Sequence, residues 1–237
     1  MGIDFNKKLF LYLSIGFFLF TIIGTLSHEL GHYAFAKSKG YSATISYGFC
    51  NWNDSENETY LNFVYKKYPN EIKKQIDFPT GEKFLKILKK QSNNSFWITL
   101  GGPLQTMLTG TIGFVMLLGY RNKIYNVEKL NFKQWMILFI SLFWCRQIYN
   151  FISGFIIYLL RDNYPEGNDE IKLALSLGIP KISISLSTAI IGVIIFVFIF
   201  FKVIPKKQRL TFLISGFVGG LFGIYFWLYL VGPIVMP

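Results

Sequence analysis

The chain has 237 residues, 52% of them hydrophobic and 19% aromatic, and a formal net charge of +11. Its mean hydropathy of +0.38 exceeds that of ordinary soluble domains, so it holds more apolar residues than a soluble core needs. The positive charges gather at the ends of apolar segments, as at Lys7 and Lys8. This placement favours contact with anionic lipid headgroups and argues against nucleic acid as a partner.

Long uncharged stretches indicate helices that cross a membrane. Four stretches contain no Asp, Glu, Lys or Arg: residues 9–27, 95–120, 182–201 and 210–237. Each reaches the ~20 residues that a helix needs to cross about 30 Å of hydrocarbon. A fifth stretch, residues 134–160, is uncharged except for Arg146 near its middle. We therefore predict an all-α polytopic membrane protein with about five transmembrane helices and the lipid bilayer as its surroundings.

The order of these segments predicts three parts. Residues 1–39 hold the first transmembrane helix, which is expected to continue to about Ser38. Residues 40–94 form a small extramembrane insert, and residues 95–237 hold the remaining transmembrane helices. A polar loop at 161–181 interrupts the third part, and a short helix is expected to begin there at about Asn168. The charges on the two membrane faces nearly balance, so the positive-inside rule does not choose an orientation.

The insert is predicted to be α+β. "YSATISYGF" (residues 41–49) and "TYLNFVYKKY" (residues 59–68) are rich in β-branched and aromatic residues, which favours two strands. The turn-like "NWNDSENE" (residues 51–58) lies between them. Residues 83–90 alternate apolar side chains with lysines and predict a short basic amphipathic helix. Such a helix either lies on the membrane surface or covers part of the insert.

The candidate chemistry lies at the end of the first apolar segment. His28, Glu29 and His32 form an H-E-x-x-H pattern, and the chain has no other histidine. On a helix, positions i and i+4 share one face, so both imidazoles can bind one ion while Glu29 lies beside them as a general base. Zn²⁺ suits two imidazoles and an oxygen ligand. Two histidines are too few for the membrane di-iron enzymes, which need several histidine clusters.

A catalytic zinc ion normally has a third protein ligand. The second and third crossings return the chain to the membrane face that the end of the first helix reaches, so the loop at 161–181 lies on the same side as the histidines. That loop holds four acidic residues, each a candidate ligand: Asp162, Glu166, Asp169 and Glu170.

The H-E-x-x-H pattern, "GGPLQTMLTG" (residues 101–110) and "GNDEIKLALSLGIP" (residues 167–180) together resemble the site-2 protease family of intramembrane zinc metalloproteases. The resemblance implies that His28 and His32 are zinc ligands and that Glu29 is the catalytic base. It also implies that Asp169 is the third ligand, with Asp162 the next candidate. It further implies membrane-protein substrates and an active site toward the cytosolic side.

The family has a Gly-Pro motif beside its active site, which implies a substrate-binding role for Gly101, Gly102, Pro103 and Thr106. Thr106 stands where the family pattern has asparagine, and Glu170 replaces the glycine that often follows the aspartate. Proline and glycine also predict an interruption of the helix here, with exposed backbone that could hold an unwound substrate as an added strand. The alternative is close helix packing through small residues.

The predicted function is the zinc-dependent hydrolysis of peptide bonds in or next to transmembrane segments. One alternative is another membrane zinc protease, such as a prenyl-protein-type protease, whose third ligand is a glutamate. The other is a non-enzymatic binding or transport protein with a structural metal site. Arg146 either pairs with an acid near the site, steadies an oxyanion, is paired structurally, or extends toward headgroups.

Overall fold

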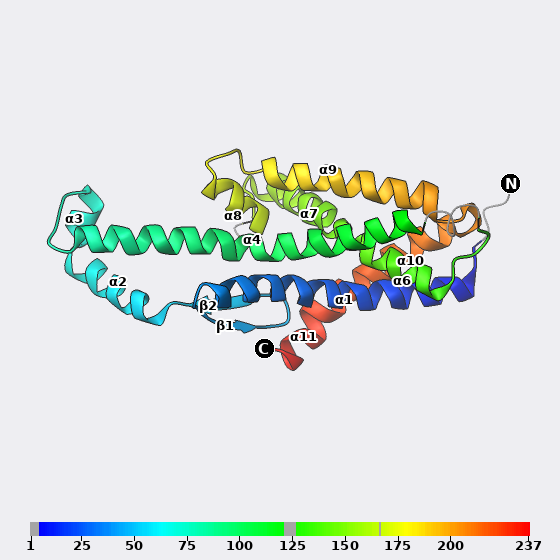
Figure 1. Ribbon diagram of the computed structural model, residues 1–237, viewed down its shortest axis with the longest axis horizontal. Coiled ribbons are helices and arrows are strands. Elements are labelled where there is room, and N and C mark those ends of the chain that lie inside the picture. The colour runs from blue at the N-terminus through cyan, green and yellow to red at the C-terminus, as the bar shows by residue number, and fades with distance from the viewer. Residues whose placement is uncertain (1–4, 121–126, 166) are drawn as a thin grey trace.

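The computed structural model describes residues 5–120, 127–165 and 167–237, which form an elongated helical bundle (Figure 1). In this described part, five helical segments are long and apolar enough to cross a membrane, which confirms the predicted fold class. They are α1 (Lys7–Ser38), α4 (Gly81–Gly119), α6 (Phe132–Ser141) with η1 (Leu142–Trp144) and α7 (Cys145–Arg161), α9 (Ser183–Phe198) with η2 (Ile199–Val203), and η3 (Lys206–Gln208) with α10 (Arg209–Tyr225), η4 (Phe226–Val231) and α11 (Gly232–Val235).

The helix α1 packs against both α4 and α10. Glycines bring α10 close to α1, because a side chain at Gly219 would collide with the backbone of Ser14. The largest apolar cluster surrounds the first half of α1 and includes Leu13, Leu138 and Phe212. His28, Glu29 and His32 lie further along α1, beyond this cluster.

The insert after α1 begins with the antiparallel hairpin of β1 (Ser42–Ile45) and β2 (Cys50–Asn53), in which Ile45 pairs with Cys50. Ala43 and Cys50 pack with Ala36 of α1 and Ile98 of α4. The hairpin is therefore held against the end of α1 that carries the histidines.

The predicted strand at 59–68 is wrong. Residues 55–67 form the helix α2 (Ser55–Lys67), followed by α3 (Pro69–Lys74), and the second strand lies within the stretch predicted as a turn. Leu61 and Val64 are spaced for one helix face, and both are buried against Phe84. This helical period outweighed the β-rich composition.

The predicted basic helix at 83–90 is the start of α4, which projects from the bundle beside α2 (Figure 1). Phe84 packs on α2, so the helix covers the insert, as in the second of the two alternatives. The predicted interruption at Gly101 is also wrong, because α4 continues through Pro103 to Gly119. Residues 121–126, between α4 and α6, lie outside the described residues.

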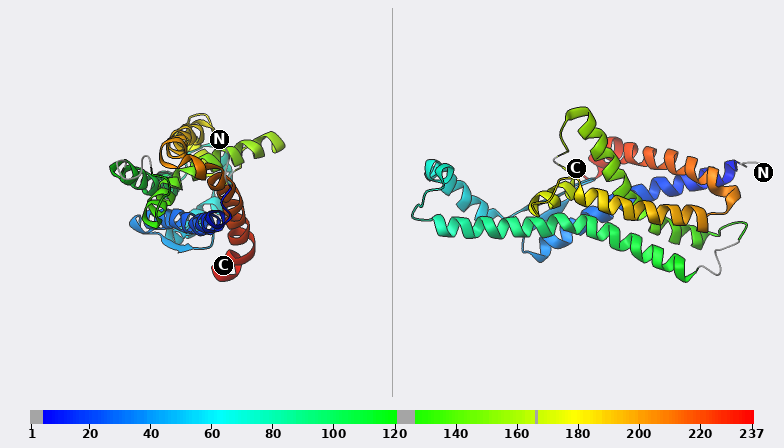
Figure 2. Two further views of the ribbon diagram at one scale, coloured as in Figure 1. Left: turned by 90° about the vertical axis from the view of Figure 1, so that its right-hand side faces the viewer. Right: turned by 90° about the horizontal axis from the view of Figure 1, so that it is seen from above.

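The third crossing leads to the remaining element of the site. Seen from above, the end of α7 leans away from the bundle, and the chain then returns to the short helix α8 (Asp169–Ser176) (Figure 2). Asn168 caps α8, because its side chain accepts a hydrogen bond from the backbone N–H of Ile171 at 3.1 Å. The contacts between α8 and α4 place the start of α8 beside the histidines.

Candidate metal centre

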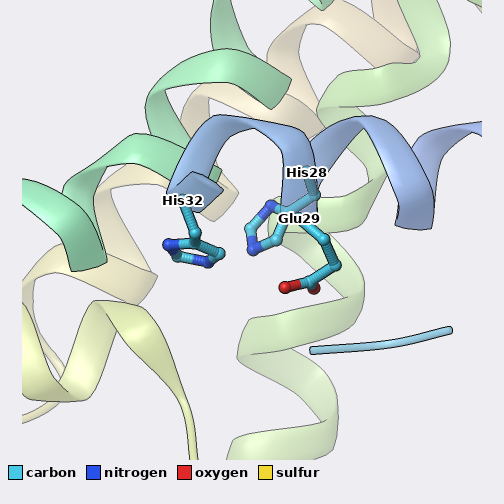
Figure 3. Close-up of side chains that lie close together, drawn as sticks. All are labelled: His28, Glu29 and His32. Carbon is cyan, nitrogen blue, oxygen red and sulfur yellow. The ribbon is translucent and has the colours of Figure 1, made fainter. Parts of the chain in front are cut away.

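His28, Glu29 and His32 project together from α1 (Figure 3). Each side chain offers one possible ligand atom, and these atoms lie within 4.8 Å of one another. The three residues are only 2%, 5% and 4% exposed, respectively. A group of two imidazoles and a carboxyl is therefore buried in a helix that has the length and composition of a membrane span.

Asp169 comes from α8 and meets both imidazoles. Its Oδ2 atom lies 3.0 Å from Nε2 of His28 and 3.1 Å from Nε2 of His32. The other acidic residues of the loop lie elsewhere. Asp162 is exposed at the end of α7, where its backbone adopts a left-handed conformation, and Glu166 lies outside the described residues. Glu170 is buried and turns toward Asn150 of α7, whose side-chain amide donates a hydrogen bond to it at 3.0 Å.

The hydrogen-bond partners of the two Nδ1 atoms determine the tautomer of each neutral imidazole, that is, which ring nitrogen carries the proton. Nδ1 of His32 lies 2.7 Å from the carbonyl oxygen of Ile98, which can only accept, so Nδ1 carries the proton. Nδ1 of His28 lies 2.9 Å from the hydroxyl of Thr106, and that hydroxyl donates its own proton to the carbonyl of Gly102. In the neutral imidazoles, both Nε2 atoms therefore present lone pairs.

Three electron-pair donors thus converge in a buried space and would repel one another without a cation among them. The 3.0–3.1 Å separations are close to the ~3.3 Å between ligand atoms around a tetrahedral zinc ion. Metal-binding histidines usually donate their other N–H to a carbonyl or hydroxyl oxygen, as both histidines do here. The buried group of His28, Glu29 and His32, with Asp169 against both imidazoles, could therefore hold a metal ion.

The acidic groups of α8 differ in their surroundings. Burial alone would raise the pKa of Asp169, whereas a proton on Nε2 of His28 or His32 would hydrogen-bond to this carboxyl and keep its pKa below its usual range. An ionised carboxylate is the form that binds a metal. Burial raises the pKa of Glu170, although the hydrogen bond from Asn150 opposes this shift.

The four residues of the Gly-Pro region are all buried in α4 against the metal site. A side chain at Gly102 would collide with Nε2 of both histidines, and a side chain at Gly101 would collide with the backbone of Gly31. Pro103 lies in the same helical turn, and Thr106 holds His28. Since α4 is continuous here, these residues provide close packing of α1 on α4 rather than an exposed backbone edge.

Three further contacts were not anticipated from the sequence. The carbonyl of Ile98 orients His32, the backbone of Cys50 in β2 interacts with the Glu29 carboxylate, and the Trp52 ring stacks on His32 with centroids 6.4 Å apart. Backbone groups carry no residue-type signal, so Ile98 and Cys50 could not be recognised from the sequence. Aromatic residues were noted in the insert, but only the hairpin fold brings Trp52 to the site.

The geometry of this centre is the basis for assigning a function. No protein-family model, curated protein sequence or solved structure gives a significant match to this chain.

Proposed function

We propose that this protein is an intramembrane zinc metalloprotease that hydrolyses peptide bonds in or next to the transmembrane segments of membrane-protein substrates. His28, His32 and Asp169 hold the zinc ion, and Glu29 is the general base. The observation that carries the proposal is the approach of Asp169 Oδ2 to Nε2 of both histidines, at 3.0 and 3.1 Å, beside the buried Glu29. Buried ionisable groups in a membrane span are costly and usually serve a function.

The chemistry follows from the residues around the centre. When bound, a zinc ion would supply Lewis acidity, lowering the pKa of a water molecule to about 7 and polarising a peptide carbonyl. Glu29 accepts a proton from the attacking water and returns it to the leaving amine as the C–N bond breaks. The hydrogen bonds of Thr106 and Ile98 hold the imidazoles in one tautomer and orientation.

A substrate helix must unwind before water can reach its peptide carbonyl. We propose that the hairpin, rather than the Gly-Pro region, holds the unwound segment. The strand β2 starts at Cys50, which interacts with Glu29, and in a two-stranded sheet each strand keeps one outer edge. An extended segment that pairs with β2 would present its backbone beside the general base.

The site also bears on the two alternatives. A glutamate as third ligand, as in prenyl-protein-type proteases, is disfavoured because Glu170 turns to Asn150 while Asp169 meets both histidines. A purely structural metal site has no use for a buried acid beside the ion, and Glu29 is such an acid. By resemblance to the site-2 protease family, the centre would face the cytosolic side.

Exchanging Glu29 for glutamine tests the proposal directly. Glu29→Gln should keep bound zinc but lower the cleavage rate of a membrane-protein substrate by at least about 100-fold, because the proton acceptor is lost. Zinc is measured on detergent-purified protein, and cleavage is measured in proteoliposomes. Glu82→Gln, an exposed glutamate at the start of α4, is the matched control. Full activity in Glu29→Gln would contradict the proposal.

A further inference from the structure

Arg146 is a charged residue in the middle of the third crossing, and it has no partner among the residues that the structure describes. Its Nε atom is buried and unbonded, and within the described ranges no group accepts a hydrogen bond from its guanidinium or forms an ion pair with it. Its charge nevertheless acts on His28, Glu29 and Glu170, so it lies near the metal centre. A structural ion pair therefore does not account for this arginine.

Extension of the side chain to the lipid headgroups does not account for it either. Arg146 follows Phe132 by 14 residues and precedes Arg161 by 15, the two ends of this span. At 1.5 Å per residue, each end is about 20 Å away along the helices, which is farther than one arginine side chain reaches. Arg146 is therefore held at mid-depth, where a charge is most expensive.

Arg146 lines a cavity that also reaches Thr106, a neighbour of the metal centre. The cavity has a volume of about 550 Å³ and lies between α1, α7 and α10. Aromatic side chains such as Phe20, Phe143 and Phe217 line it, and Arg146 is the one charged residue among the described lining residues. Thr106, the hydrogen-bond partner of His28, lines the same cavity. The volume falls in the range of about 300–1,000 Å³ that is typical of ligand sites.

We propose that Arg146 is a specificity-determining residue that pairs with a carboxylate side chain in the membrane-spanning segment of the substrate. The apolar walls of the cavity receive the neighbouring side chains of that segment. This inference rests on the proposed function and names a substrate class for it: transmembrane segments that carry an Asp or Glu near the cleavage position.

A carboxylate suits the site better than a peptide carbonyl does. A carboxylate neutralises the buried guanidinium and matches its planar donors with two parallel hydrogen bonds, whereas a carbonyl would leave the charge uncompensated. A carboxylate in a membrane span also raises the free energy, so pairing lowers the cost of burying both charged groups. A site with an unpaired polar group also rejects substrates that lack the matching group more strongly than an apolar pocket does.

Matched substrates test the pairing. Single-span model proteins that carry Asp, Asn or Lys at one position, moved stepwise along the span, are incubated in proteoliposomes with the wild type, Arg146→Met and Arg146→Glu. At one or two positions, the wild type should cleave the Asp substrate about 10- to 100-fold more efficiently than the Asn substrate. Arg146→Met should lose this preference, and Arg146→Glu should shift it toward Lys. Arg161→Gln, on the exposed end of the same helix, should keep it.

Arg146→Met is also the folding control. Because Arg146 has no partner within the described residues, this variant should keep its zinc and its unfolding temperature. Equal cleavage of the Asp and Asn substrates by the wild type at every position would overturn the inference. A uniform loss on all substrates in Arg146→Met would also overturn it.

Failure of the proposed function gives a different result, namely no cleavage of any substrate by the wild type. In that case, binding of the same Asp and Asn spans is measured by crosslinking in the liposomes. Asp-dependent binding that disappears in Arg146→Met supports the pairing, and binding that is independent of the acid overturns it.

Discussion

The two imidazoles depend on oxygen atoms that the chain supplies from α4. Thr106 stands where the resembled family has asparagine. Its hydroxyl still accepts a hydrogen bond from Nδ1–H of His28 and donates one to the Gly102 carbonyl. A threonine can do this within a continuous helix, because its hydroxyl reaches the carbonyl one turn earlier. The substitution therefore keeps a hydrogen-bond partner for His28.

Removing that partner should weaken zinc binding. In Thr106→Val the shape is nearly unchanged, but the buried Nδ1–H of His28 loses its acceptor and the ring loses its fixed orientation. We expect the zinc affinity to fall about 10- to 100-fold, as for other partners of metal-binding histidines. Competition with a chromogenic chelator measures it. The control is Thr188→Val, whose hydroxyl bonds only to its own helix. An unchanged affinity in Thr106→Val would rule out this role.

At the scale of elements, the site depends on the close approach of α1 and α4. Gly31 and Gly101 touch backbone to backbone, since a side chain on either would collide with the other. Lipid tails are as apolar as the side chains, so the hydrophobic effect does not drive membrane helices together. They associate largely through such close packing. The contact lies within one turn of both His28 and His32, so it also sets the depth of the metal site between the helices.

A methyl group at this contact should separate the helices. Gly101→Ala should destabilise the protein by about 1–3 kcal/mol through overpacking and should lower its zinc content. Gly119→Ala is the control in the same helix, since a side chain there meets nothing within 4 Å. Its effect should stay within about 1 kcal/mol. Unfolding in detergent and metal analysis measure both quantities. Equal behaviour of the two variants would mean that the contact is not tight.

At the scale of the whole molecule, the candidate metal centre joins parts that are distant in the sequence. His28 and Asp169 are 141 positions apart and belong to α1 and α8. The helix α1 continues for ten residues beyond His28, about 15 Å at 1.5 Å per residue, so the centre lies inside this span and not at its end.

Zinc should hold α8 in place. Removal of the zinc ion by a chelator should leave the lone pairs of His28, His32 and Asp169 facing one another. We therefore expect α8 to detach while the five spans stay folded. The unfolding temperature should fall, because a ligand at about 1,000 times its dissociation constant contributes about 4 kcal/mol. Hydrogen exchange should rise in α8, with α9 as the internal reference. Added zinc should restore the unfolding temperature and the slow hydrogen exchange of α8. Hydrogen exchange in α8 that is unaffected by chelation would contradict this prediction.

Several features of the fold could be predicted because their signals are local. The four uncharged stretches and the stretch around Arg146 located all five candidate spans, and the start of α8 was expected at about Asn168. The strand prediction at 59–68 failed because its composition was read without its helical period, in which Leu61 and Val64 share a face. The interruption predicted at Pro103 did not occur. Loss of a single donor is compatible with a helix packed tightly against a neighbour.

The sequence by itself determined that the chain has helices long and apolar enough to cross a membrane, and that two histidines share one helix face. Both signals lie within single helices. Only the tertiary structure decided among the acidic residues of the loop. Asp162 and Asp169 look alike in the sequence, but a left-handed turn leaves one exposed and the cap at Asn168 turns the other toward His28. The tertiary structure also placed Arg146 at the edge of a cavity, with no partner in the described part of the chain. Such pairings depend on how the helices meet, and no local pattern encodes that.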